Sequence, residues 1–129
     1  MAEEFRIGAI MTTTDLLREA VSARDRGDLC HAETILQQIQ AEHQESSTYF
    51  AILGHVKWNL DKLDEAIVAF RRATTLAPTE EIVSIALFHC LWECDDTDAA
   101  FTEARRYVTA GGESKAYRQL FSEIRGGRE

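Results

Sequence analysis

The chain has 129 residues, of which 45% are hydrophobic and 28% charged, and it contains a single proline. Such a length and composition exclude disordered, collagen-like and mucin-like chains and fit one domain or one short array of repeats. The formal net charge of −8 disfavours binding to nucleic acids and to anionic lipid surfaces. No apolar run is long enough to span a membrane, and the start of the chain lacks the basic residues of a signal peptide, so we expect a cytoplasmic protein.

Apolar residues recur at helical spacing along the whole chain, and turn-forming or helix-capping residues interrupt this pattern at intervals. The pattern predicts an all-α protein with helices over 14–26, 29–42, 47–59, 63–76, 80–94, 97–110 and 115–125. The predicted connections are only about two to five residues long, so we expect consecutive helices to lie antiparallel.

Similar residues recur at an interval of 34 positions. Gly27-Asp28 is followed by Asp61-Lys62 and then by Asp95-Asp96, and Ala32 is followed by Ala66 and Ala100. The middle unit carries the longest pattern, Phe50-x-x-Leu53-Gly54 and then Ala66-x-x-x-Phe70-x-x-Ala73-x-x-x-x-Pro78. This period and this pattern resemble the tetratricopeptide repeat. The resemblance implies a right-handed α-solenoid of three helix hairpins, at 13–46, 47–80 and 81–114.

Small residues in this pattern allow close contact between helices. We expect Gly54 and Ala66 to let the two helices of the middle unit touch, and Phe70 to fill the space between units. Pro78 is expected to end the second helix. The third unit departs from the pattern, because Phe88 stands where the middle unit has Gly54.

The segments outside the repeats differ in their predicted roles. In a terminal helix within 115–129, apolar residues recur at helical spacing, which predicts a helix that caps the solenoid: Tyr117, Leu120, Phe121 and Ile124. Residues 1–12 form an N-terminal arm that carries Phe5, Ile7, Ile10 and Met11. This arm either folds over the first repeat or docks on another subunit or on a client.

The sequence offers little for catalysis. It has no glycine-rich phosphate loop, no nucleophile elbow and no HExxH zinc motif, so we expect neither enzymatic activity nor a cofactor. His89, Cys90 and Cys94 lie within one predicted helix and could contribute ligands to a metal site. The alternative is that these cysteines are small residues of the core.

The tetratricopeptide resemblance implies a concave face lined by the first helix of each unit. The expected positions hold Thr14, Leu17, Val21 and Arg24, then Thr48, Ala51, His55 and Trp58, then Ile82, Ile85, His89 and Trp92. All of them except Thr14, Thr48 and Ile82 are candidate binding residues. The pair His55/Trp58 recurs as His89/Trp92, and residues three apart share a helix face, which predicts an apolar, aromatic groove for a peptide. The alternative is that both tryptophans pack between the units as core.

A narrower resemblance suggests a partner. The chain is similar to the small acidic chaperones of bacterial type III secretion over Arg26-Gly27-Asp28, Ser47-x-Tyr49-Phe50-x-x-Leu53-Gly54, Leu63-Asp64-Glu65-Ala66-Ile67, Pro78, His89-Cys90-Leu91-x-x-Cys94 and Ala104. This resemblance implies three repeats, binding of hydrophobic translocator or needle subunits in the bacterial cytosol, and a tendency to self-associate. The lysines and asparagines with which other repeat adaptors clamp a carboxylate are absent from the expected positions.

Three hypotheses follow. The first is a non-catalytic chaperone or adaptor that holds an apolar segment of a client protein in the concave groove. The second is a scaffold, a dimer or larger oligomer, that assembles through the N-terminal arm or the convex face. The third is a metal-binding protein that uses His89, Cys90 and Cys94.

Overall fold

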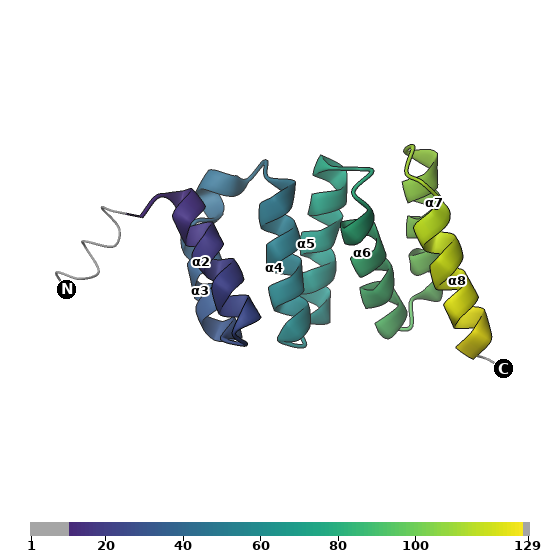
Figure 1. Ribbon diagram of the computed structural model, residues 1–129, viewed down its shortest axis with the longest axis horizontal. Helices are drawn as coiled ribbons and strands as arrows, with labels where there is room; N and C mark the ends of the chain where they lie inside the picture. The colour runs from purple at the N-terminus through teal and green to yellow at the C-terminus, as the bar shows by residue number, and fades with distance from the viewer. Residues whose placement is uncertain (1–10, 128–129) are drawn as a thin grey trace.

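The computed structural model describes residues 11–127, which form seven α-helices and no strand. The helices follow one another in a row, with successive helices running up and down (Figure 1). Their bounds are α2 (Thr13–Asp25), α3 (Leu29–Gln38), α4 (Ser47–Asn59), α5 (Leu63–Leu76), α6 (Glu81–Glu93), α7 (Thr97–Thr109) and α8 (Lys115–Gly127). The predicted all-α fold is confirmed, and α2/α3, α4/α5 and α6/α7 form the three hairpins.

One predicted helix is shorter than expected. The helix expected over 29–42 ends at Gln38 and is followed by a 3-10 turn, η1 (Gln40–His43). The Tyr49 hydroxyl donates a hydrogen bond of 2.7 Å to the Leu36 carbonyl oxygen. In a continuing α-helix this oxygen would accept the Gln40 N–H. The tyrosine of the next hairpin therefore replaces the backbone bond that the turn lacks.

The same backbone turn closes the first helix of each hairpin. Gly27, Asp61 and Asp95 all have a positive φ, of 85°, 62° and 62°. In each turn the following N–H, that of Asp28, Lys62 or Asp96, bonds to the carbonyl oxygen five residues earlier, at 2.8 to 3.0 Å. This left-handed residue and this long bond define a Schellman cap. The sequence repeat is thus also a repeat of backbone conformation.

Close packing within the middle hairpin explains its glycine. A Cβ atom added to Gly54 would lie 2.6 to 2.8 Å from ring atoms of Phe70, so no larger residue fits there without movement of the ring. Phe70 and Ala66 are fully buried. The expected close contact between the two helices is therefore present between Gly54 on α4 and Phe70 on α5.

Helix α8 packs against α6 and closes one end of the row. A buried polar cluster joins it to the third hairpin: the Ser84 hydroxyl donates to Glu103 at 2.6 Å and lies 2.7 Å from the Tyr117 hydroxyl. Arg106 donates two further bonds to the Glu103 carboxylate, at 2.7 and 2.6 Å. Because each polar group in this cluster has a partner, the cluster fixes how α8 sits without leaving a buried charge unpaired.

At the other end of the row, the predicted arm lies mostly outside the described residues, which begin at Met11. Thr12 is the N-cap of α2: its hydroxyl accepts the Asp15 N–H at 3.1 Å, and the Asp15 carboxylate accepts the Thr12 N–H at 3.2 Å. Among helices of the described part, none has the length and apolar character needed to cross a membrane.

Candidate peptide-binding groove

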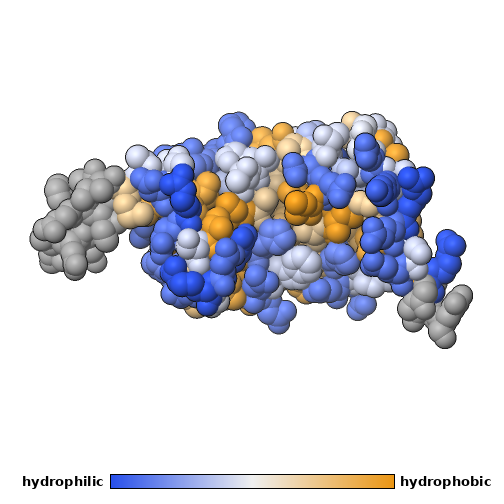
Figure 2. All heavy atoms as spheres, viewed as in Figure 1, coloured by the Kyte–Doolittle hydropathy of each residue, from blue (hydrophilic) through white to orange (hydrophobic). Residues whose placement is uncertain are grey.

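The first helices of the three hairpins, α2, α4 and α6, enclose a hollow of about 310 Å³. Figure 2 has the same view as Figure 1 and shows apolar residues along the middle of the visible face, with hydrophilic residues around them. The hollow, here called the peptide groove, is lined by Arg24, Ser47, Thr48, Ala51, Ile52, His55, Glu80, Ile82 and Val83. It is formed by all three hairpins.

Three of the candidate binding residues line this groove, namely Arg24, Ala51 and His55. Thr48 and Ile82, which occupy the expected concave positions but were not candidates, line it as well. Glu80 is the N-cap of α6 and lies outside the helical positions that the repeat pattern marks. Only the closeness of that helix start to α4 in space brings its side chain into the groove.

His55 contributes an uncharged ring to the groove. It is half-buried, and its ring packs edge-on against Phe70 with the centroids 5.1 Å apart. Burial, and secondly the positive charge of Arg24, lowers the pKa of His55 below its ordinary value. The imidazole is therefore neutral at pH 7, and it offers hydrogen bonding without a charge.

Trp58 lies between the second and third hairpins. Its indole N–H donates to the Glu93 carboxylate at 3.2 Å, and its ring stacks on His89 with centroids 6.3 Å apart. The ring also meets Phe70 edge-on, at 6.2 Å. Trp58 is half-buried and does not line the peptide groove, so much of its surface is used to join the hairpins.

Trp92 has different surroundings from Trp58, although it occupies the equivalent position. Its ring stacks on Phe88 and meets Phe101 edge-on, with both centroid distances 5.8 Å. The first pair of the repeat stacks, with the centroids of His55 and Trp58 6.1 Å apart, whereas the ring that stacks on His89 is Trp58. Both tryptophans are half-buried and pack against the core, and whether either contacts a peptide stays a prediction.

The other candidate residues lie beside the groove rather than in its lining. Leu17, Val21, Ile85 and His89 are half-buried, and the three aliphatic side chains pack against the core. Whether these residues contact a peptide stays a prediction.

The two cysteines of α6 and its C-terminal end have different surroundings. Cys90 is fully buried, and burial, followed by the charge of Glu93, raises the pKa of its thiol to about 12. Cys94 is exposed at the end of the same helix. Among residues 11–127, no group of three or more His, Cys, Asp or Glu side chains is placed to hold a metal ion. Cys90 is instead a small core residue.

Comparison with known proteins shows similarity in structure rather than in sequence. No protein-family model and no curated protein sequence matches the chain. The crystal structure of MamA matches with a TM-score of 0.74 and 19% identity over 84% of this chain, which spans 64% of the MamA chain, less than two thirds of its length. The type III secretion chaperone SycD of Yersinia enterocolitica, in complex with a peptide of the translocator YopD, matches with a TM-score of 0.73 and 16% identity over 91% of each chain.

This chain has the tetratricopeptide-repeat fold. A second SycD structure, described as an alternative dimer, matches with a TM-score of 0.73 and 16% identity over 89% of this chain and 87% of SycD. The part of this chain that has the tetratricopeptide-repeat fold therefore aligns with nearly the whole length of SycD. At these identities the similarity concerns the arrangement of helices.

Proposed function

We propose that this protein is a non-catalytic interaction module that holds an apolar peptide segment in the peptide groove. The observation that carries the proposal is Ile82, a large hydrophobic side chain that lines the groove and is 67% exposed. Ala51, on α4 of the second hairpin, lines the groove as well and is half-buried, and beneath the two residues the groove floor is formed by the buried Ile52 and Val83. Burying such a surface against a ligand releases about 25 cal/mol per Å² of apolar area.

The charges of the groove favour a peptide whose central residues are apolar. Arg24 and Glu80 are the ionisable residues of the lining apart from His55, which is neutral at pH 7. Arg24 already bonds to the Asp25 carboxylate, at 3.1 and 3.2 Å, so its charge is partly satisfied. A segment with apolar side chains in the middle fits this arrangement better than an acidic tail does.

The structural similarity to SycD suggests the class of client. The SycD structure contains a peptide of a translocator, a protein of type III secretion. We infer that the client of this protein is a hydrophobic segment of an exported protein, held in the bacterial cytosol before export. A repeat solenoid of net charge −8 would keep such a segment covered and soluble.

The test compares two exposed aliphatic residues. Peptides are first selected from a displayed random library on the wild-type protein, and their affinities are then measured for Ile82→Glu and Val68→Glu. Val68 is a matched control, because it is 69% exposed and lies on α5, away from the peptide groove. We expect apolar peptides that bind Ile82→Glu about ten-fold or more weakly, as is typical when a charge replaces an interface anchor, and that bind Val68→Glu unchanged.

Two results would contradict the proposal. One is a selection that yields no binding peptides. The other is an equal loss of affinity in both variants, which would place the binding surface elsewhere. Circular dichroism of both variants establishes that the fold is unchanged, as expected for substitutions at exposed positions.

A further inference from the structure

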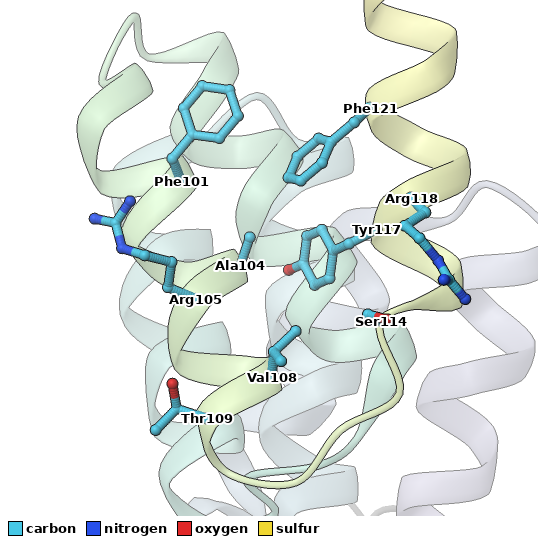
Figure 3. Close-up of a pocket in the computed structure, with 9 residues that line it drawn as sticks. All are labelled: Phe101, Ala104, Arg105, Val108, Thr109, Ser114, Tyr117, Arg118 and Phe121. Atoms are coloured by element: carbon cyan, nitrogen blue, oxygen red, sulfur yellow. The ribbon is translucent and has the colours of Figure 1, made fainter.

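A second apolar groove lies between α7 and α8, at the end of the solenoid. It has a volume of about 480 Å³ and is here called the end groove. Figure 3 shows the rings of Phe101 and Phe121 at one end, with Tyr117 and Val108 further along. The lining consists of Phe101, Ala104, Arg105, Val108, Thr109, Ser114, Tyr117, Arg118 and Phe121. None of these residues lines the peptide groove.

The end groove lies beside α8, the last helix among the described residues. Helix α8 follows the third hairpin in the place of a fourth first helix, and among the described residues no second helix follows it. In a solenoid such a second helix would cover both α8 and the preceding second helix, α7. As a result Phe101 and Val108 remain 36% and 44% exposed, which makes them two of the four large exposed hydrophobics in the described part.

The charge around the end groove indicates an acidic occupant. Arg105 and Arg118 line it, and neither forms an ion pair with any residue in the range 11–127. Among side-chain hydrogen bonds of the described residues, Arg105 takes part in one, to the hydroxyl of Thr102 at 3.1 Å. Two guanidinium groups without an ion-pair partner in the described part therefore lie beside an apolar groove. They fit a segment that combines carboxylates with apolar side chains.

The N-terminal arm of this chain has that composition. Glu3 and Glu4 are followed directly by Phe5, and then by Ile7 and Ile10; Arg6 is the one positively charged side chain among residues 1–11, so the carboxylates outnumber it by one. The arm precedes α2, whereas the end groove lies beside α8 at the opposite end of the row (Figure 1). Successive first helices are about 10 Å apart, so α8 lies roughly 30 Å from α2, and ten residues reach at most about 36 Å when fully extended. An arm that reached its own end groove would have almost no residues left to fill it.

We propose that residues 1–11 of one copy bind in the end groove of a second copy, with the glutamates beside Arg105 and Arg118 and the apolar side chains against Phe101, Val108 and Phe121. The contact is heterologous, because a different surface is used on each copy. It therefore joins copies head to tail and leaves a free arm and a free end groove at the two ends of every assembly.

The test uses two variants that each remove one side of the contact. Deletion of residues 2–11 removes the arm but leaves the end groove, and Val108→Glu places a carboxylate in the end groove but leaves the arm. Sedimentation velocity over a range of concentrations should show wild-type assemblies that grow with concentration. Each variant alone should remain monomeric or associate at least about ten-fold more weakly.

Mixing the two variants is the decisive measurement. The Val108→Glu chain supplies an arm and the deleted chain supplies an end groove, so an equimolar mixture should form a heterodimer and nothing larger. Val68→Glu and Ile82→Glu should both assemble like the wild type, since neither residue lines the end groove. This last result keeps the experiment separate from the test of the peptide groove.

Several outcomes would overturn the proposal. A wild-type protein that stays monomeric at every concentration would show that no such contact forms. A Val108→Glu chain that assembles as well as the wild type would show that arms pair with each other or bind elsewhere. A mixture of the two variants that remains monomeric would show that the arm and the end groove do not recognise one another.

Discussion

The second and third hairpins place a large and a small residue at equivalent positions, but in opposite order. On α4 and α5 the small residue comes first, with Gly54 against Phe70. On α6 and α7 the equivalent positions, 34 residues later, hold Phe88 and Ala104. Phe70 and Phe88 are both fully buried. The repeat thus preserves the combined volume of the two positions rather than the identity of either residue.

The reversed order changes what the third hairpin can contact. The ring centroid of Phe88 lies 5.7 Å from that of Tyr117 and 6.0 Å from that of Phe121, both on α8. It lies 5.8 Å from the ring centroid of Trp92. Phe70, on α5, instead contacts His55 and Trp58 on α4, the first helix of the same hairpin. A large residue on the first helix therefore gives α8 an aromatic surface to pack on, which the second hairpin does not offer.

The largest effect is expected from Phe88→Ala. Removal of a fully buried ring that contacts α8 should lower the free energy of unfolding by about 3–5 kcal/mol. Urea unfolding followed by circular dichroism measures the loss. Phe101→Ala is the control, because Phe101 belongs to the same aromatic group but is 36% exposed, and should lose clearly less. Equal losses would mean that Phe88 has no special role in holding α8.

A smaller loss is expected from Gly54→Ala, which adds one methyl group against Phe70. The overlap should lower the free energy of unfolding by about 1–3 kcal/mol. In a Phe70→Leu background, where the ring is absent, the added methyl should cost less. The coupling between the two substitutions is obtained from a double-mutant cycle in urea. If the cost of Gly54→Ala is the same in both backgrounds, the contact with Phe70 is not its cause.

The smallest effect is expected at the turns, and here it is stabilising. Asp61 and Asp95 adopt the left-handed conformation that Gly27 adopts in the first hairpin. Asp61→Gly and Asp95→Gly should each raise the free energy of unfolding by up to about 1 kcal/mol, because glycine has no Cβ to strain this conformation. Thermal unfolding detects such a gain. Gly27→Ala should have the opposite sign, and a stabilising Gly27→Ala would refute the explanation.

The helices were predictable because their signals are local. Both the spacing of apolar residues and the turn formers, such as Gly27 and Asp95, can be recognised from neighbouring residues in the sequence. The 34-residue period then predicts which helices pair into hairpins. The 3-10 turn after Gln38 was not predictable, because it depends on a bond from Tyr49 in the next hairpin.

The site was predictable only in part. The repeat pattern indicates which side of each first helix faces the concave surface, and Ala51 and His55 do line the peptide groove. It does not indicate which of those side chains a neighbouring hairpin covers. Trp58, a candidate binding residue, packs against Phe70 and His89 and donates a hydrogen bond to Glu93, and its contact with a peptide stays a prediction. Contacts of this kind join residues of two hairpins and have no signature in one sequence.

The fluorescence of the two tryptophans can report on two different parts of the molecule. Trp58 touches the third hairpin through Glu93 and His89, and Trp92 contacts Phe88 and Phe101 within the third hairpin. Variants that keep only one tryptophan would report by fluorescence on the contact between the second and third hairpins or on the interior of the third hairpin. In a molecule whose units touch only their neighbours, the two signals need not change together, and any gap between their melting curves would reveal separation of the hairpins before they lose their helices.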